Sequence, residues 1–386
     1  MDKQVKKNIL IIAGEASADM HGAELVKRLK TLSPGLQIYG IGGNKLREAG
    51  VQVFADLTPY ALIGFFEVLK HLSIFKNIFR LTLRKIRQIE PCAVILMDLP
   101  GFNLKMASAI KAKFPGIKII YYISPQIWAW GQNRINIIRN TVDKMLVFFE
   151  FEKYFYEKHN IDVDFVGHPL LETVKPAKGK EQILNELNLK KEDKIIGLLP
   201  GSRMMEIARI LPLMLKGAEQ LNKKMRGIKF ILFRAPGINE VIFEQIMKNF
   251  PGLAIITITG NNYDFLNICS FAWVCSGTAT LETALMEVPM LVVYKTSFVT
   301  WLISKSLIRL PYIGLVNVVA QEKIVPEFIQ YQATDKNICR YTANFLLRPE
   351  EEQNILREKL KTLKKNLGKD NASQNAARII AQYLSD

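Results

Sequence analysis

The sequence predicts an α/β protein built on parallel sheets, and two observations support this fold class. Apolar runs of strand length recur along the 386 residues, and amphipathic helical patterns separate them. Because strands that alternate with helices form βαβ units, helices should cover both faces of each sheet. The chain is also long enough for two or three domains. The expected strands lie at 8–13, 94–97, 117–123, 144–149, 194–199, 229–233, 272–275 and 290–294.

Composition narrows the class of protein. Hydrophobic residues make up 49% and charged residues 23%, which excludes a largely disordered chain. The 52 basic and 36 acidic residues leave a net charge of +16, which favours phosphates, nucleic acid or an anionic membrane surface as partners. The spacing of the four cysteines does not suggest disulfide pairs. The first residues lack the apolar region of a signal peptide, and no continuous apolar stretch is long enough to span a bilayer. We therefore expect a cytoplasmic location.

Segments rich in Pro, Gly and charged residues predict the domain boundaries. A charged segment with Pro and Gly precedes the strand at 194–199, so we place one domain at 1–172 and a second at 185–348. The remaining residues, 349–386, are predicted to form two helices broken at Gly368.

The turn after the first strand is a candidate ligand site. It reads GEASADMHGA, and we expect a helix to begin near Asp19 with Ser17 or Asp19 as its N-cap. Glu15 lies at the carboxyl end of the strand, where open α/β sheets bind ligands. The dinucleotide pattern GxGxxG is absent, which argues against a nicotinamide enzyme.

Asp98 is the strongest candidate for a catalytic base. It ends the apolar run AVILM, so its carboxyl group should emerge at the edge of a buried strand. Partial burial would raise its pKa toward the range that a general base needs. The alternative is a helix-capping aspartate. Asn103, five residues on, is either a ligand contact or a turn former.

Two aromatic segments of the front half suggest binding surfaces. Residues 62–87 form a basic, amphipathic, Phe-rich stretch that suits either a membrane surface and acyl chains or packing against the sheet. Trp128 and Trp130 stand near Arg134, a combination that suits a sugar or an anion, or simply loop packing. His168 follows a further strand and is interpreted as a turn residue.

The second half carries two similar strand–turn–helix motifs. The strand at 194–199 continues into PGSRMMEI, which places Arg203 and Glu206 at a helix start suited to a diphosphate. Later, SGTATLETA places a Ser276–Thr278 turn before a helix that carries Glu282, a carboxylate able to accept both hydroxyls of a ribose. Metal-ligand spacing is lacking, so we expect no metal ion and no other cofactor.

The sequence resembles the lipid-A-disaccharide synthase family through an ordered set of motifs between about residues 8 and 330, and the set is far more specific than any single motif. The motifs are GEASADMHGA from Gly14, GFFEVL from Gly64, DLPGFN from Asp98, ISPQIWAW from Ile123, FVGHPL from Phe165, LLPGSRMMEI from Leu198, SGTATLETA from Ser276 and NVVAQEKIVPEFIQ from Asn317.

This resemblance implies two Rossmann-like domains of the B-type glycosyltransferase architecture and an inverting, metal-independent reaction. UDP-2,3-diacylglucosamine would be joined to 2,3-diacylglucosamine 1-phosphate, forming the β-1,6 disaccharide of lipid A and releasing UDP. It further implies peripheral attachment to the cytoplasmic face of the inner membrane and, in some members, dimers that exchange C-terminal parts. Nucleic acid is not an implied partner.

The resemblance also implies residue roles. Asp98 would remove the proton from the acceptor 6-hydroxyl. The residues Glu15, Ser17 and Asp19 would contact the acceptor and the donor sugar. The residues implied in UDP binding are Arg203, Ser276, Gly277, Thr278 and Glu282, with Asn317, Glu327 and Gln330 near the nucleotide. From the local sequence, Glu206 and Asn103 are further candidate substrate contacts.

Three positions depart from the family pattern. Ala18 replaces a usual Gly, Gly101 replaces a frequent Asp, and Gly131 replaces a common basic residue. Because position 101 carries no carboxyl group, Asp98 is the acid of this motif that could act as the base. Two alternatives remain at the level of sequence: another UDP-sugar transferase or epimerase, and a basic protein that binds lipid without turnover.

Overall fold

The computed structural model describes residues 7–61, 72–260, 262–298, 301–302, 310–369 and 371–385, which form two compact units. The first unit contains Met1–Pro169 and Leu367–Asp386, and the second contains Leu170–Asn366. The chain therefore passes between the units twice. The two tail helices expected after residue 349 are present but are divided between the units: α18 (Glu350–Asn366) belongs to the second and α19 (Ala372–Tyr383) to the first.

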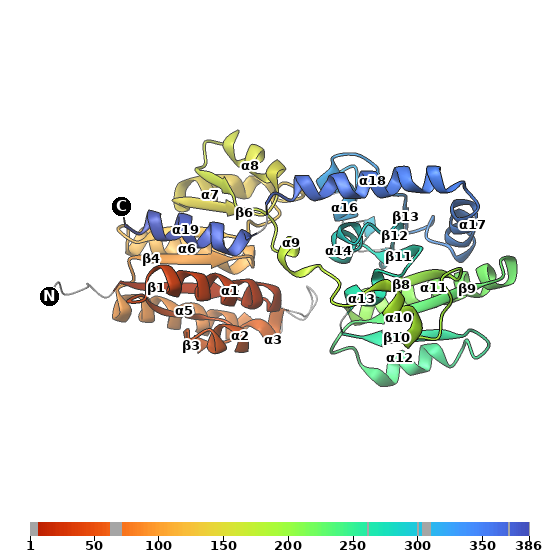
Figure 1. Ribbon diagram of the computed structural model, residues 1–386. Coiled ribbons are helices and arrows are strands. Elements are labelled where there is room, and N and C mark those ends of the chain that lie inside the picture. Colours follow the sequence, from red (N-terminus) through yellow and green to blue (C-terminus); the bar gives the residue numbers. More distant parts are fainter. Residues whose placement is uncertain are drawn as a thin grey trace. The chain divides into compact units, whose positions relative to one another are not determined.

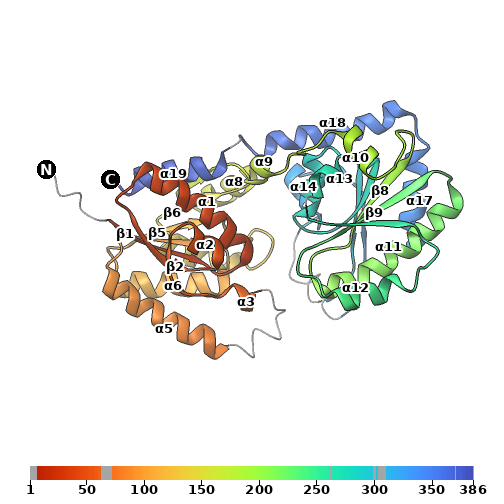
Figure 2. The same cartoon turned by 60° about the horizontal axis from the view of Figure 1, so that its bottom comes forward.

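A parallel seven-stranded sheet in the order β3-β2-β1-β4-β5-β6-β7 forms the centre of the first unit. Figure 2 shows α1 and α19 on one face of this sheet and α5 and α6 on the other. The strands are β1 (Asn8–Ala13), β2 (Gln37–Ile41), β3 (Gln52–Ala55), β4 (Ala93–Met97), β5 (Lys118–Tyr122), β6 (Lys144–Val147) and β7 (Val163–Phe165). The helices are α1 (Ala16–Leu32), α2 (Asn44–Glu48), α3 (Thr58–Ala61), α5 (Leu72–Ile89), α6 (Pro100–Lys113), α7 (Ile135–Thr141) and α8 (Glu150–Glu157), with the 3-10 turn η1 (Gln132–Arg134).

A second parallel sheet, in the order β10-β9-β8-β11-β12-β13, organises the second unit (Figure 1). The strands are β8 (Lys194–Leu199), β9 (Ile228–Arg234), β10 (Ile255–Thr259), β11 (Phe271–Cys275), β12 (Met290–Tyr294) and β13 (Glu327–Ile329). Before α18 come the helices α9 (Leu170–Thr173), α10 (Lys180–Glu186), α11 (Met204–Lys224), α12 (Glu240–Met247), α13 (Asn262–Leu266), α14 (Ala279–Leu285), α16 (Leu315–Ala320) and α17 (Asp335–Leu346).

The predicted α/β class with two parallel sheets is confirmed, and all the expected strands are present. The central strands were visible in the sequence because burial on both faces makes them continuously apolar: every residue of β4 and β11 is buried. Strands β2, β3, β10 and β13 were not predicted, because they are short, partly exposed or near the sheet edges.

The amphipathic helix α5 turns its apolar side chains toward the protein. The rings of Phe75 and Phe79 lie 6.3 and 5.7 Å from the ring of Phe102 in α6, and Ile86 is buried. Packing therefore accounts for Phe75 and Phe79 in this part of the predicted Phe-rich stretch. The rest of that stretch, residues 62–71, lies outside the described residues, and so does the GFFEVL motif.

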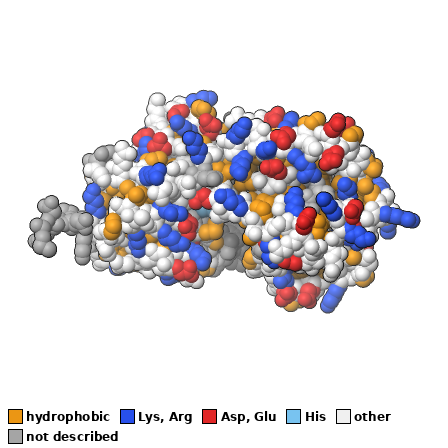
Figure 3. Space-filling view, viewed as in Figure 1, with side chains coloured by type: hydrophobic (Ala, Val, Ile, Leu, Met, Phe, Trp, Pro, Cys, Tyr) orange, Lys and Arg blue, Asp and Glu red, His pale blue; other side chains and the backbone are white. Residues whose placement is uncertain are grey.

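Basic side chains are spread over the face of the two units that Figure 3 shows. Figure 3 shows lysine and arginine side chains distributed across the face seen in Figure 1, with acidic side chains between them. The net charge of +16 is therefore not gathered into one patch on this face.

Candidate functional site

The candidate site residues of the first unit follow strands that end at the same edge of its sheet, the carboxyl edge. The register pairs Ala13 of β1 with Met97 of β4, and Met97 with Tyr122 of β5. The residues that follow these strands, Glu15 and Asp98 among them, therefore start at the same edge. The strand order reverses direction between β1 and β4, which is the position where open α/β sheets bind ligands.

Asp98 occupies an unusual turn at this edge. Its φ angle is 47° and that of Leu99 is 43°, so two successive residues with side chains adopt the left-handed conformation before α6 begins at Pro100. Burial raises the pKa of the Asp98 carboxyl group above its ordinary value, and a hydrogen bond from the backbone of Leu99 partly opposes this effect. A carboxylate with a raised pKa accepts a proton more readily near neutral pH, as the predicted base requires.

Asn103 lies beneath the turn rather than at the surface. It is fully buried, and its Nδ2 donates to the carbonyl oxygens of Met97 and Asp98 at 3.0 and 2.7 Å. Of the two interpretations from sequence, the geometry matches the turn former. Its predicted contact with substrate has no support in this arrangement.

Helix α1 begins earlier than the sequence suggested. It starts at Ala16, and Glu15, not Ser17 or Asp19, occupies the N-cap position without a side-chain capping bond. Glu15 is half-buried and Ser17 is exposed, so both side chains can be reached from the sheet edge. A Cβ atom at Gly14 would lie 2.3 Å from Cδ2 of Leu99, so a larger residue here would have to displace the Leu99 side chain.

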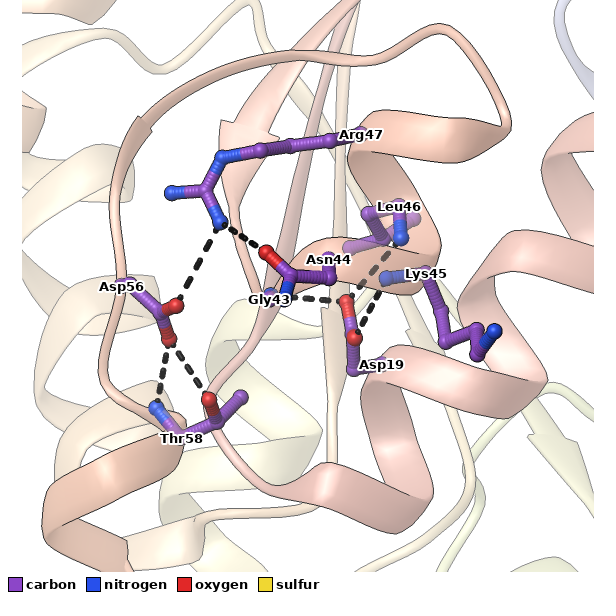
Figure 4. A network of polar contacts seen from close by, with 8 residues as sticks. All are labelled: Asp19, Gly43, Asn44, Lys45, Leu46, Arg47, Asp56 and Thr58. Carbon is purple, nitrogen blue, oxygen red and sulfur yellow. Dashed lines mark hydrogen bonds and ion pairs between the residues drawn. The ribbon is translucent and has the colours of Figure 1, made fainter.

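Asp19 is a buried carboxylate that organises a neighbouring loop (Figure 4). Its oxygens accept hydrogen bonds from the backbone N–H groups of Gly43, Lys45 and Leu46 at 2.7, 3.0 and 3.2 Å. These groups lie at the start of α2, where the helix leaves N–H groups without internal partners. Asp19 therefore stabilises the β2–α2 connection, a role that local sequence did not reveal.

The tryptophans of the ISPQIWAW motif have different environments. Trp128 is buried, and its Nε1 donates to Oε1 of the buried Glu152 at 2.9 Å. Trp130 is exposed, and the guanidinium carbon of Arg134 lies 4.7 Å from its ring centroid. Trp130 and Arg134 thus form an accessible aromatic–cation pair, whereas Trp128 belongs to the loop's packing.

Sequence reasoning missed Glu152, which anchors this loop. Its carboxyl group also accepts from Oγ of Ser124 at 2.6 Å and from the backbone N–H of Phe149 at 3.2 Å. Burial raises its pKa from 4.5 to about 7, although the three hydrogen bonds oppose the shift. Between these values the folded protein binds more protons than the unfolded chain. The stability that this group contributes is therefore complete below pH 4.5 and lost as the pH rises through about 7.

Glu152→Gln should remove this dependence on pH. We expect the free energy of unfolding of the variant, relative to the unsubstituted protein, to rise between pH 5 and pH 8, measured by urea unfolding at several pH values. Glu157→Gln, an exposed position on the same helix, serves as the control and should leave the pH dependence unchanged. Parallel pH curves for Glu152→Gln and the unsubstituted protein would contradict the assignment.

His168, interpreted from the sequence as a turn residue, is buried in the segment between β7 and α9. Its ring centroid lies 5.3 Å from that of Phe148 and 5.1 Å from that of Phe149, and its backbone N–H donates to Leu367 at 2.9 Å. Burial lowers its pKa to about 3, and burial lowers the pKa of His21 to about 4. Both imidazoles are therefore neutral near pH 7.

The second sheet repeats the arrangement around β8 and β11. Its strand order reverses between these two neighbours, and both predicted turns follow them. Arg203 is the N-cap residue of α11, with an exposed side chain. Glu206 caps the same helix, because its Oε2 accepts from the N–H groups of Ser202 and Arg203, each at 3.2 Å. The carboxylate of Glu206 is thus engaged by the turn, and its Oε1 also accepts from the guanidinium of Arg203 at 3.2 Å, while the Arg203 side chain stays exposed.

The turn after β11 is held by its own hydroxyl groups. Oγ of Ser276 donates to the carbonyl of Ile313 at 2.9 Å, and Oγ1 of Thr280 donates to the carbonyl of Gly277 at 2.8 Å. Gly277 has a φ of 148°, and Thr278 is the N-cap residue of α14. Three predicted residues, 276 to 278, therefore form one ordered backbone turn.

Glu282 is oriented by a residue that sequence reasoning missed. The hydroxyl of Tyr263 in α13 donates to its Oε1 at 2.8 Å. Burial raises the pKa of Glu282, and the Tyr263 hydrogen bond opposes the shift. With one oxygen fixed in this way, the direction of the carboxylate is defined.

The late-motif residues form a buried framework. Oε1 of Glu327 accepts from the N–H of Gly314 at 2.9 Å and from Nδ2 of Asn317 at 2.9 Å. Gln330 holds Thr296 by two hydrogen bonds, from the Thr296 N–H at 2.8 Å and to its carbonyl at 3.2 Å. These three predicted residues fix the chain before α16 and after β12, and their carboxylate and amide groups are engaged with protein atoms.

The described residues contain no group of three or more His, Cys, Asp or Glu side chains arranged to hold a metal ion. They also contain no helix that is both long enough and apolar enough to cross a membrane.

Solved structures with this arrangement establish the class of fold. The S. aureus MnaA–UDP co-structure has a TM-score of 0.67 at 13% identity, covering 98% of this chain and 97% of that one. A glycosyltransferase from Rickettsia africae ESF-5 has a TM-score of 0.59 at 12% identity and 99% coverage of both chains. The fold is therefore the B-type glycosyltransferase architecture of two Rossmann-like units.

The family follows from closer relatives. The family model for lipid-A-disaccharide synthetase matches residues 9–383. Lipid-A-disaccharide synthase 1 of Legionella pneumophila (strain Lens) is 41% identical over 378 residues, 98% of each chain, and the Geobacter sulfurreducens synthase is 38% identical over 384 residues, 100% of this chain and 99% of the other. The chain belongs to the lipid-A-disaccharide synthase family and is a glycosyltransferase that forms the lipid A disaccharide.

Proposed function

We propose that the protein transfers diacylglucosamine from UDP-2,3-diacylglucosamine to the 6-hydroxyl of 2,3-diacylglucosamine 1-phosphate. The observation that carries this proposal is Asp98, a partly buried carboxyl group with a raised pKa at the switch point of the first sheet. Its carboxylate would take the hydroxyl proton as the acceptor oxygen attacks the anomeric carbon. The bond from that carbon to UDP then breaks on the opposite side, so one displacement gives the inverted β-1,6 linkage without a covalent glycosyl-enzyme.

The second unit would bind UDP. We assign the diphosphate to the accessible guanidinium of Arg203 and to the backbone turn of Ser276, Gly277 and Thr278. Glu282, which Tyr263 orients, would accept hydrogen bonds from the ribose hydroxyls. The framework of Asn317, Glu327 and Gln330 supports these groups rather than contacting UDP.

The first unit would contact the sugars. Glu15 and Ser17 follow β1 at the same edge as Asp98 and are the groups we assign to the acceptor and donor sugar. Asp19 would support the sugar site without contacting the sugars, because it holds the loop at the start of α2.

We also propose that the protein attaches peripherally to an anionic membrane surface at the cytoplasmic face of the inner membrane. Acylated substrates require access to lipid, and the net charge of +16 favours an anionic surface. In α5, Arg80, Arg84 and Arg87 are exposed, as is Leu72. A homodimer that exchanges the C-terminal tail is the assembly that the family resemblance favours, and the tail contains the second of the two passages of the chain between the units.

The decisive experiment measures UDP release from the diacylated donor in detergent micelles. We expect release only when the acylated sugar phosphate is also present, and mass spectrometry should identify a disaccharide. Isomerised donor without disaccharide would indicate an epimerase instead. Lipid binding that persists with no product under any condition would indicate a binding protein.

Arg203→Ala should weaken UDP binding about ten-fold, because a charge-assisted contact with the diphosphate is lost. Isothermal titration with UDP measures the change. Arg226→Ala, at a surface position in the same unit, is the control and should bind UDP normally. Equal affinities for Arg203→Ala and the control would remove Arg203 from the diphosphate site.

A further inference from the structure

We propose that Tyr121 and Asn103 are positioning residues that aim the carboxyl group of Asp98 by fixing its backbone. This inference rests on the proposed role of Asp98 as the base. Its starting point is the left-handed conformation of Asp98 and Leu99, with φ angles of 47° and 43°. A residue with a Cβ atom rarely adopts this conformation, so surrounding contacts must hold it.

Those contacts converge on the carbonyl oxygen of Asp98. The hydroxyl of Tyr121 donates to it at 2.6 Å, and Nδ2 of Asn103 donates to it at 2.7 Å. On the other side, the N–H of Asp98 donates to the carbonyl of Ile123 at 3.3 Å. Both peptide groups of Asp98 are thereby fixed, and with them the direction of its Cα–Cβ bond.

The two donors are built into the rigid part of the fold. Tyr121 lies within β5, where it pairs with Leu96 of β4, and Asn103 lies in the first turns of α6. Both side chains are fully buried. They therefore connect the base to one neighbouring strand and to the helix that follows it, and neither side chain needs to touch substrate.

The tyrosine hydroxyl is not explained by packing alone. Tyr121 belongs to the apolar cluster under α5 and α6, where a phenylalanine ring would fill the same space without a polar atom to bury. Burial first, and the charge of Asp98 second, raise the pKa of Tyr121 well above its ordinary value. The hydroxyl therefore remains protonated and keeps donating to the Asp98 carbonyl throughout the working pH range.

Tyr121→Phe removes the hydroxyl that donates to the Asp98 carbonyl and keeps the ring. We expect kcat to fall about ten-fold with little change in the KM for the UDP-sugar, because a misdirected base slows the proton transfer and leaves nucleotide binding intact. Tyr39→Phe is the matched control, since it removes a hydroxyl from β2 of the same sheet, and it should keep the normal rate.

A double-substitution cycle distinguishes positioning from general structural support. In an Asp98→Asn background, Tyr121→Phe should cause no further loss in single-turnover rate, because the carboxylate that it aims is already absent. Asn103→Ala is tested in the same cycle and should behave alike, which keeps the inference testable if one variant folds poorly. Thermal unfolding of each protein checks the fold.

The outcomes separate this inference from the proposed function. Full activity of Asp98→Asn would overturn the base itself. An inactive Asp98→Asn together with a fully active Tyr121→Phe would overturn only the positioning role. A Tyr121→Phe loss that is the same size with and without Asp98 would also overturn it, since that additivity marks a purely structural effect.

Discussion

Asp98→Asn is expected to lower turnover by a factor of about 100 to 10,000 while leaving UDP affinity nearly unchanged. The amide has almost the same shape as the carboxyl group but cannot accept the proton of the acceptor hydroxyl. Because the backbone of Asp98 is held by Tyr121, Asn103 and Ile123, the substituted side chain should remain in place. The loss of turnover would therefore reflect the missing proton acceptor and not a change in structure. Measurement of kcat tests the turnover, and titration with UDP tests the affinity.

Asp162→Asn provides the control for this prediction. Asp162 is an exposed aspartate of the same unit, and Lys144, with which it pairs, keeps a second partner in Asp164 at 2.7 Å. We expect normal turnover for this variant. If Asp98→Asn lost UDP binding as much as turnover, Asp98 would be a structural residue, and the base would have to be sought among the other acids at this edge, such as Glu15.

The sheets were predictable wherever burial dictated the sequence. Strands β1, β4, β8 and β11 lie at the centres of the sheets, and their runs of apolar residues are the direct result of cover on both faces. The outer strands are less buried, so burial restricts their sequences less. In β3 and β10, no residue is fully buried, so their pattern resembles that of a loop, and their pairing with β2 and β9 supplies the order that local sequence lacks.

Some site residues could be predicted from the local sequence, whereas others depend on contacts between distant parts of the chain. Asp98, Glu15 and Arg203 could be located because each follows a predictable strand, and a parallel register brings strand ends to one edge. The partners of Asp19 could not be located. They are backbone N–H groups 24 to 27 positions away, and any sequence at those positions supplies them.

The same limit applies to the buried polar residues. Glu327 and Asn317 were expected near the nucleotide, but their hydrogen bonds to each other and to the chain before α16 become visible only in three dimensions. Nothing in the local sequence marks Tyr121, Tyr263 or Glu152 as a polar anchor. Each is distinguished by its polar group and by the partners that the fold places against it.

Gly201→Ala is expected to weaken UDP binding on the order of 100-fold, more than the loss of Arg203, because it distorts the turn that presents the site. Gly201 has a φ of 110°, which an alanine rarely adopts. An added Cβ atom would also lie 2.5 Å from Oε2 and 3.0 Å from Cβ of Glu206, whose carboxylate caps α11. Relief of this clash must move Glu206, the following N–H groups or Arg203, and each belongs to the same turn.

Gly252→Ala separates this effect from the general consequences of adding a methyl group. Gly252 belongs to the same unit, and an added Cβ atom there meets nothing within 4 Å. Calorimetric titration with UDP should therefore give normal affinity for Gly252→Ala and a large loss for Gly201→Ala, with circular dichroism confirming that both variants are folded. Equal affinities in the two folded variants would mean that the nucleotide does not depend on the turn after β8, and the diphosphate would then have to be assigned to the Ser276–Thr278 turn alone.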